Sequence, residues 1–554
     1  MRLSRSGWLA ATGMALRPAV APWALRPAAA VIVAAAAVCA IGIPLGRPDL
    51  VAVCLFGTAC AAVLADRTGT RAICATSLLW QALGACAGIA LGSLTHGPIG
   101  SVVLAGAVGA FSGPLGRLGR AGAGAGLMAI IGVAFAAFGG SALSWYQQCL
   151  CYLAGTAAIA VADLGPWPWR PRDVRRAAVV EVFRACAAVF ESAGSRAAPT
   201  ARSGLVAASQ RARKVVFGPR LRWRRRPVPY EDVWRRAADA ALQAAAATVD
   251  RQARPAEAAQ MRIWADALQN GDRIDWPTAE PVDVAPPAEL RARAVVGRGA
   301  WADGIRIGWC MALATAVTLL LHDPGHALWI PLTVSVLVRP EYGTVFVRVV
   351  NRLAGTLAGG ALAAALLLVL GSGPPVAAAA AIAIGFSVAA APKSYALSVI
   401  GVTCGALMSA SIATADPVVP LVRVGDTLIG AAIAVVFGFV LWPGRGAPDP
   451  SQGLRAAVTA SADYLRAVTT GTDVAAASEQ AYTAAGNAID LSRAALLEPP
   501  PVGALARRSL ARSLAVKSIV DEITALRRHG GDSTAAVLRG RLANIENEST
   551  AGGE

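Results

Sequence analysis

Lysine and histidine are scarce in this sequence, and their scarcity excludes several common catalytic motifs. Lysine occurs only at Lys214, Lys393 and Lys517, so the chain lacks the Gly-Lys-Ser/Thr sequence that holds nucleotide phosphates in a P-loop. The four histidines form neither a His-Glu-x-x-His pair nor a cluster with the spacing of metal ligands. We therefore expect no ATP hydrolysis through a P-loop, no metal site and no other cofactor. We predict that the chain is not an enzyme.

Charged residues as a whole are also few. They make up 15% of the chain, whereas about 25% is usual in soluble proteins. Long apolar runs accompany this deficit, a combination typical of proteins that cross a bilayer several times. The formal net charge is nevertheless +17, almost entirely from arginine. A basic chain can bind nucleic acid. Arginine beside apolar segments, however, is typical of the cytoplasmic loops of membrane proteins. We therefore predict no nucleic-acid partner.

The ten cysteines do not have the pattern of a disulfide framework. All but Cys186 lie inside apolar runs, where cysteine packs as a small hydrophobic residue. Cys149-Leu150-Cys151 lacks the spacing of a zinc or redox pair. The N-terminal region shows no clear signal-peptide cleavage site, so we predict that its first apolar run is retained as a span.

Apolar runs fall in two clusters, each with six segments near the length that a bilayer requires. The predicted spans of the first cluster are 27–45, 50–65, 73–94, 98–115, 122–139 and 143–164. Those of the second cluster are 304–321, 326–339, 352–370, 375–391, 395–412 and 421–442. The arginine-rich ends of both clusters fall on one side, which predicts that the N- and C-termini are cytoplasmic.

These runs predict an all-α, multi-pass membrane protein with five parts. They are a cytoplasmic N-terminal segment, a first transmembrane repeat, a basic cytoplasmic helical domain, a second transmembrane repeat, and a C-terminal cytoplasmic helical domain with a tail. Their predicted bounds are 1–26, 27–165, 166–300, 301–443 and 444–554.

The two clusters resemble each other. Trp167-Pro168 closes the first and Trp442-Pro443 closes the second, and Ala-Ala-Ile-Ala-Val precedes each of them. Chance similarity between alanine-rich helices is the alternative, but several separate matches occur in the same order. Because each unit has an even number of spans, we predict parallel repeats, related by an axis along the membrane normal.

The basic cytoplasmic domain contains a polybasic stretch beside the membrane. We predict that it contacts anionic lipid headgroups. Its arginines are Arg220, Arg222, Arg224, Arg225 and Arg226.

Two places in the second cluster carry residues that are unusual in a membrane segment. Pro331 lies in an apolar run, where it removes a backbone donor and frees an upstream carbonyl. Such a group is tolerated in a bilayer where protein or a water-filled cavity satisfies it. Trp329 is either an interfacial anchor or the wall of a substrate path. Arg423 and Asp426 lie on one face of the last span and form either a site for a permeant ion or a structural bridge.

The stretch HALWIPLTVSVLVRPEYGT, residues 326–344, precedes LAGTLAGG at 353–360. Together they resemble the signature of the fusaric acid resistance family of integral membrane transporters, which includes aromatic acid exporters. The family pattern runs His-Gly-x-Trp-x-Pro-Leu-Thr, then Arg-Pro-Asp-Tyr-Gly-x-Thr, then Gly-Thr-x-x-Gly. Here Ala327 replaces the usual glycine and Glu341 the usual aspartate. The resemblance implies proton-coupled export of aromatic or other organic carboxylates.

We therefore predict a secondary transporter in the plasma (inner) membrane that exports small organic anions, with aromatic carboxylic acids as a candidate class. We expect Arg423 to attract the carboxylate, Trp329 and Tyr342 to contact the ring, and Asp426 or Glu341 to carry the coupling proton. The candidate residues of the substrate path are Trp329, Pro331, Thr333, Arg339, Glu341, Tyr342, Arg423 and Asp426.

Arg339, Arg348 and Arg352 are expected to concentrate anions at the cytoplasmic mouth of this path. Two other functions stay open: a passive organic-anion channel, and a non-transporting scaffold for cell-envelope proteins. A homo-oligomer is also left open.

Overall fold

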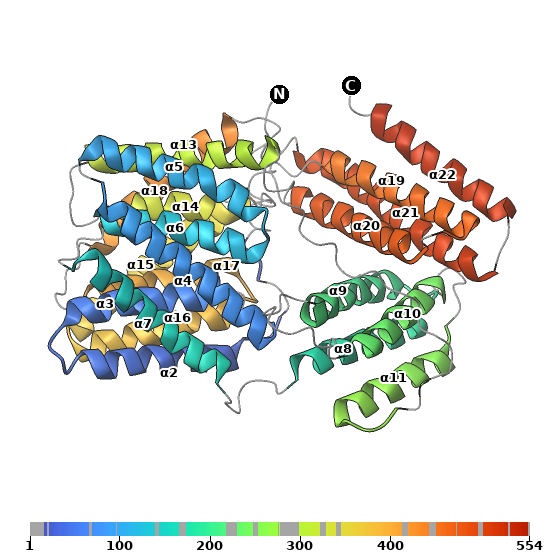
Figure 1. Cartoon of the computed structure of the whole chain (residues 1–554), viewed down its shortest axis with the longest axis horizontal. Helices are drawn as coiled ribbons and strands as arrows, with labels where there is room; N and C mark the ends of the chain where they lie inside the picture. The colour runs from blue at the N-terminus through green and yellow to red at the C-terminus, as the bar shows by residue number, and fades with distance from the viewer. Residues whose placement is uncertain are drawn as a thin grey trace. The chain divides into compact units, whose positions relative to one another are not determined.

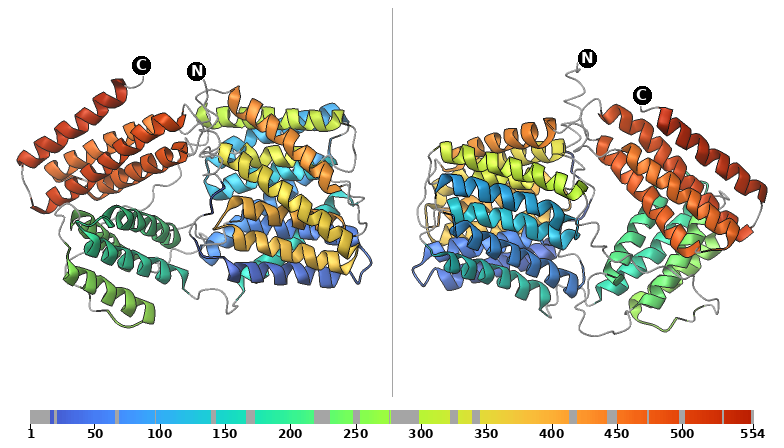
Figure 2. Two further views of the ribbon diagram at one scale, coloured as in Figure 1. Left: turned by 180° about the vertical axis from the view of Figure 1, so that it is seen from behind. Right: turned by 45° about the horizontal axis from the view of Figure 1, so that its top comes forward.

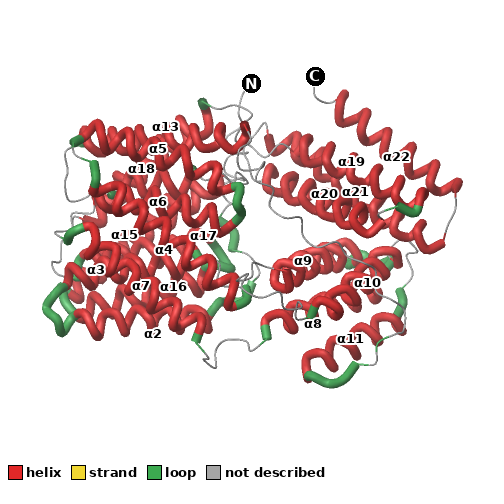
Figure 3. The backbone as a smooth tube through the Cα atoms, in the orientation of Figure 1, coloured by secondary structure: helices red, strands yellow, loops and turns green. Residues whose placement is uncertain are grey.

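The computed structural model is all-helical over the residues that it describes, with no strand among them (Figure 3). Twenty α-helices and one π-helical turn lie in these described ranges. The described ranges are 16–18, 21–65, 69–95, 97–138, 143–165, 173–217, 230–247, 253–274, 276, 298–321, 328–338, 345–412, 419–441, 450–472, 474–496, 502–529 and 532–551.

The helices belong to two compact units. The first, which we call the apolar bundle, comprises Met1–Arg170, Glu289–Ala447 and Leu497–Pro499. The second, which we call the polar bundle, comprises Pro171–Ala288, Pro448–Leu496 and Pro500–Glu554.

Each of the twelve predicted spans overlaps one helix of the apolar bundle (Figure 1). The helices of the first cluster are α2 (Leu25–Gly42), α3 (Pro48–Leu64), α4 (Arg71–Ser93), α5 (Pro98–Gly116), α6 (Arg120–Phe138) and α7 (Trp145–Leu164). Those of the second cluster are α13 (Arg298–Leu320), α14 (Trp329–Leu337), α15 (Val345–Leu370), α16 (Pro374–Ala390), α17 (Tyr395–Ala410) and α18 (Val419–Val435), which the π-helical turn η1 (Val436–Val440) follows.

Six helices of the described residues are long and apolar enough to cross a membrane, which identifies a multi-pass membrane protein. The six segments are Leu25–Gly42, Arg71–Ser93, Pro98–Gly116, Arg120–Phe138, Ala300–Leu320 and Val347–Leu370. Helices α3, α16 and α17 are apolar but shorter. Helix α14 has only nine residues, which at 1.5 Å per residue is about half of the hydrocarbon thickness of a bilayer.

The two clusters interlock instead of forming separate halves. Helix α13 of the second cluster packs along α5 of the first, and α2 of the first packs along α16 of the second. Figure 1 and the two views in Figure 2 show both pairs side by side. One hydrophobic core joins Ala35 and Leu55 from the first cluster to Leu367, Ala380 and Leu407 from the second. The apolar bundle is therefore one packed body.

Small residues allow the closest helix pairs of this bundle to form. A Cβ atom at Gly84 or Gly88 of α4 would overlap the backbone carbonyl of Ala125 or Ala129 on α6. Helices that lack a hydrophobic driving force in lipid gain van der Waals contact from such approaches. Glycine at every fourth position of α4 thus determines how close α6 lies.

The glycine-rich stretch at the start of α6 has the same role. Its spacing resembles a dinucleotide-binding fingerprint, but we interpret it as a surface for close helix packing. In the structure a Cβ at Gly122 would overlap the carbonyl oxygen of Leu115, and one at Gly126 would lie 3.1 Å from Ser112. Both partners belong to α5, so the packing interpretation is confirmed.

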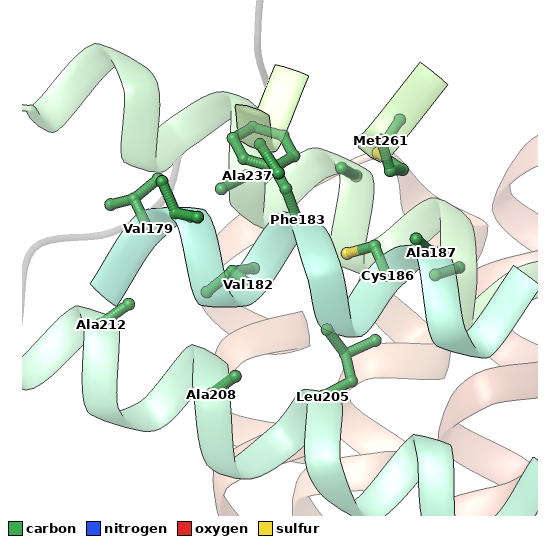
Figure 4. Close-up of a cluster of buried hydrophobic side chains, with 14 of the residues drawn as sticks. Val179, Val182, Phe183, Cys186, Ala187, Leu205, Ala208, Ala212, Ala237 and Met261 are labelled. Atoms are coloured by element: carbon green, nitrogen blue, oxygen red, sulfur yellow. The ribbon is translucent and has the colours of Figure 1, made fainter. Parts of the chain in front are cut away.

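The polar bundle consists of helices from both segments that follow the transmembrane clusters. They are α8 (Val174–Ser192), α9 (Ala198–Phe217), α10 (Glu231–Ala247), α11 (Pro255–Asn270), α19 (Pro450–Thr470), α20 (Val474–Leu496), α21 (Val502–His529) and α22 (Asp532–Ala551). Figure 4 shows one of its two cores, which includes Phe183 and Cys186 of α8, Leu205 of α9 and Met261 of α11. Helix α10 also contacts α21, so both chain segments contribute to one unit.

Tyr230 connects two helices of the polar bundle at their N-termini. It is the one non-glycine residue with positive φ, at 68°, among those that the structure describes. Its hydroxyl donates to the carboxylate of Asp173 at 2.5 Å, and the same carboxylate accepts from the backbone N–H of Arg176 at the start of α8. Burial and this hydrogen bond raise the pKa of Tyr230 to about 12. The polybasic stretch from Arg220 to Arg226 lies outside the described residues.

Replacing Gly88 with alanine tests the packing of α4 on α6. Alanine favours a helix by about 1 kcal/mol over glycine, but here its methyl group would meet the backbone of Ala129, which cannot move aside. Overpacking of this kind costs about 1–3 kcal/mol. We expect a lower Tm for Gly88→Ala in detergent, measured by thermal unfolding.

The matched control is Gly100→Ala on α5. A Cβ at this position makes only ordinary contacts, at 3.7 Å or more, so its Tm should equal or exceed that of the wild type. Equal Tm values for the two variants would contradict the packing described here.

Candidate functional site

Three helices of the second cluster meet around the buried charges of the apolar bundle. The short helix α14 contacts α15 and α18, and α15 and α18 contact each other. Helix α14 contributes Trp329, α15 contributes Arg352, and α18 contributes Arg423 and Asp426. A Cβ at Gly430 of α18 would lie 2.9 Å from the Cβ of Thr333, so α14 and α18 pack closely here.

Arg423 is the most unusual residue of this site. Its side chain lies near the start of α18, and only 2% of its surface is exposed. The guanidinium carbon lies 4.1 Å from the centroid of the Trp329 ring, and Nη1 donates a hydrogen bond of 3.4 Å to the Trp329 backbone carbonyl. Its Nε is buried without a hydrogen-bond partner. A cation stacked on an indole gains attraction from the ring quadrupole, so Trp329 stabilises this buried charge.

Asp426 lies on the same face of α18 as Arg423, as its spacing predicts. It is 8% exposed and interacts electrostatically with Arg423. The structure thus brings together three of the predicted site residues, namely Trp329, Arg423 and Asp426.

Arg352 lies in a different place from the one that the sequence predicts. It was expected at the cytoplasmic mouth together with Arg348, but it is only 4% exposed and interacts electrostatically with Arg423. The predicted span begins at residue 352, whereas α15 begins at Val345. Arg352 is therefore two helical turns inside its helix. Its Nε and Nη2 are buried without hydrogen-bond partners.

Two buried hydroxyl groups lie on the same helices. Thr333 of α14 has no exposed surface, and Thr356 of α15 is 1% exposed. The Oγ1 atom of each has no hydrogen-bond partner. Thr333 was among the predicted residues. Thr356 follows Arg352 by four positions and so lies on the same face of α15, a spacing that the sequence already contains.

Pro331 does not interrupt the middle of a helix. It is the third residue of α14, where backbone N–H groups have no partner within the helix in any case. A proline in this first turn therefore starts the helix without breaking it. The carbonyl that it would leave free, that of Ala327, lies outside the described residues, as do Arg339, Glu341 and Tyr342.

A second buried arginine, Arg306 of α13, was not predicted as a functional residue. It is 2% exposed, and its Nη1 donates a 3.0 Å hydrogen bond to the backbone carbonyl of Gly438. Gly438 lies in the π-helical turn η1, where the wider backbone turn changes the usual pairing of carbonyl groups. Arg306 therefore has a structural partner at the end of α18.

The described residues contain no group of three or more His, Cys, Asp or Glu residues that could hold a metal ion. The ten cysteines are free in the structure.

Comparison with known families places this site within a recognised segment. Residues 310–437 match the model of the fusaric acid resistance protein-like family, so the resemblance seen in the sequence is confirmed. The matched segment runs from α13 to η1 and contains Trp329, Arg352 and Arg423. No curated protein and no solved structure matches the chain.

The contact between Trp329 and Arg423 can be tested by Trp329→Leu. This change keeps the backbone carbonyl but removes the ring, and with it about 0.5–2 kcal/mol of cation–π attraction. We expect a Tm several degrees lower, measured by thermal unfolding in detergent. Trp309→Leu is the control, because Trp309 of α13 is 58% exposed and makes no such contact among the described residues. A Tm for Trp329→Leu as high as that of the control would show that the ring does not stabilise Arg423.

Proposed function

We propose that this protein is a secondary transporter that exports small organic anions, with aromatic carboxylic acids as the first candidate class. The observation that carries the proposal is the guanidinium of Arg423, which is buried at 2% exposure in an apolar helix bundle. A charge at such a depth costs several kcal/mol and is retained where it binds a permeant ion or a structural partner. Its hydrogen bond from Nη1 to the Trp329 carbonyl is long at 3.4 Å, and its Nε is buried without a hydrogen-bond partner.

The family match supports the same reading. The matched family is described as fusaric acid resistance protein-like, and fusaric acid is itself an aromatic carboxylic acid. Because the matched family consists of transporters, the match also favours a function other than catalysis for this protein. The three helices of the candidate site all lie inside the matched segment.

In the proposed mechanism the carboxylate of the substrate binds to Arg423. A guanidinium binds a carboxylate through two parallel N–H donors. The Trp329 ring holds the guanidinium plane in position from one side. Asp426, or Glu341 of the neighbouring segment, carries the coupling proton. Proton binding at Asp426 would remove a negative charge beside Arg423 and so would strengthen anion binding.

The two clusters are proposed to be parallel repeats in the plasma membrane, with both termini in the cytoplasm. Helices at the same position in each cluster make the same contacts, which supports this arrangement. The third helix packs on the fifth in both clusters, α4 on α6 and α15 on α17. The second helix packs on the sixth in both, α3 on α7 and α14 on α18. The contacts between the two clusters also correspond. The fourth helix of each cluster packs on the first helix of the other, α5 on α13 and α16 on α2. An even number of spans per repeat returns the chain to the same side of the membrane.

Counterflow of radiolabelled benzoate in proteoliposomes tests the role of Arg423. We expect Arg423→Ala to lose at least about 90% of the wild-type flux, because it removes a charge-assisted donor pair. Arg47→Ala serves as the control, since Arg47 is exposed and pairs only locally with Asp49 at 2.8 Å. Equal flux for Arg423→Ala and wild type would remove Arg423 from the mechanism. No wild-type flux of benzoate or of other aromatic and aliphatic carboxylates would overturn the proposed function.

Proton coupling is tested with Asp426→Asn. We expect this variant to exchange benzoate across the membrane but to lose accumulation driven by an imposed pH gradient, because asparagine cannot carry the proton. The measurement compares counterflow with gradient-driven uptake in the same vesicles. Benzoate current in a bilayer without proton movement in the wild type would instead support a passive channel.

A further inference from the structure

Arg352 and Arg423 form a pair of buried cations on neighbouring helices. They are 4% and 2% exposed, respectively, and they interact electrostatically. Two like charges in a medium of low dielectric constant repel each other strongly, and neither can recover the hydration that it loses on burial. Asp426 interacts electrostatically with Arg423 and offsets one of the two positive charges. A second anion close to both guanidinium groups would offset the other.

The donor atoms of this pair are incompletely used. Nε of Arg423 and both Nε and Nη2 of Arg352 are buried without hydrogen-bond partners. A buried Nε of this kind also occurs at Arg306 of the same bundle, whose Nη1 donates to the carbonyl of Gly438 at 3.0 Å. The additional buried Nη2 without a partner therefore distinguishes Arg352. A buried donor that makes no bond costs about 1–3 kcal/mol, so three such atoms on two neighbouring arginines point to a missing acceptor.

A hydroxyl group adjoins the same arginine. Thr356 lies one turn beyond Arg352 on the same face of α15, and its Oγ1 is buried without a hydrogen-bond partner. A hydroxyl can donate one hydrogen bond to an anion. Helix α15 therefore presents two neighbouring donors, and α18 presents the third.

We propose that Arg352 and Arg423 together bind one carboxylate group, with each guanidinium donating to it and the Thr356 hydroxyl as a further donor. A carboxylate fits because its two oxygens offer about four acceptor positions and its charge lowers the repulsion between the two cations. This inference deepens the proposed function and rests on it for the identity of the anion. It makes Arg352 of α15 a substrate-binding residue, whereas the sequence alone predicted that Arg352 concentrates anions at the cytoplasmic mouth.

Binding of benzoate and of its neutral analogue benzamide to the purified full-length protein tests the proposal. Benzamide has the same ring and nearly the same shape but no charge. We expect the wild type to prefer benzoate. Arg352→Gln should weaken benzoate binding by about tenfold or more, as loss of a hydrogen bond to a charged group implies, and should leave benzamide binding unchanged. Titration calorimetry in detergent measures both ligands.

Two further variants separate binding from folding. Arg352→Lys keeps the charge but loses the planar fork, so it should retain part of the benzoate preference even if the glutamine variant does not fold. Arg47→Gln is the control, because Arg47 is exposed and pairs locally with Asp49 at 2.8 Å, and it should keep the wild-type ratio of the two affinities. The proposal would be overturned if Arg352→Gln had the same ratio of benzoate affinity to benzamide affinity as the wild type. It would also be overturned if the wild type bound benzoate no more tightly than benzamide.

The proposal and the proposed function can fail separately. If the wild type prefers benzoate through Arg352 but carries no flux in proteoliposomes, the carboxylate site stands and the transport function fails. If the wild type carries benzoate and Arg352→Gln binds and transports it equally well, the transport function stands and the role of Arg352 fails.

Discussion

The burial of positive charge in an apolar helix bundle is the constraint on which the candidate site depends. A guanidinium excluded from water must be stabilised by an aromatic ring, a carbonyl, a carboxylate or an anion. The apolar bundle meets this requirement differently at each buried arginine. Arg306 has a backbone carbonyl at 3.0 Å. Arg423 has the Trp329 ring, a more distant carbonyl and a nearby carboxylate. Arg352 has two donor atoms without a partner. A buried Nε without a hydrogen-bond partner is common to all three arginines. The length of the bond to the backbone carbonyl, and its absence at Arg352 among the described residues, separate Arg306 from the two arginines that we assign to ligand binding.

Close packing by small residues fixes the geometry around these charges. Gly355 and Gly359 bring α15 against the backbone of α17 at Ala396 and Ile400, and Asn351, beside Arg352, accepts a hydrogen bond from the Ala396 N–H at 3.1 Å. On the other side, Gly430 allows α18 to approach Thr333 of α14. Because these contacts involve backbone atoms, the helices cannot shift far without losing them. The LAGTLAGG stretch thus contributes to the site by positioning α15, although it contains few polar atoms.

The sequence predicted the positions of the helices well and the environment of individual side chains less well. Hydrophobic length alone located twelve helices, since an apolar run must be helical to satisfy its backbone in lipid. The i, i+3 spacing placed Arg423 and Asp426 on one face. The burial of Arg352 was missed because the arginine was taken as the boundary of its span, and only the start of α15 at Val345 shows that it lies inside. Pro331 lies in the first turn of α14, which begins at Trp329, a position that the apolar run alone did not indicate. Contacts between helices, such as that of Arg423 with Trp329, depend on packing that no local pattern encodes.

The hydrogen bonds of the buried arginines also differ in how easily an anion could replace them. Typical N–H···O distances are about 2.7–3.2 Å, so the bond from Arg306 to Gly438 is of normal strength. The bond from Arg423 to the Trp329 carbonyl, at 3.4 Å, is long and correspondingly weak. A charge-assisted bond to a carboxylate is shorter and roughly twice as strong as a neutral one. An anion that binds to Arg423 therefore gives up little when it displaces this carbonyl, whereas displacing Gly438 from Arg306 would leave a π-helical carbonyl without a donor. The same helix, α18, is thus held firmly at its η1 end and loosely at the end that carries the proposed ligand-binding residue.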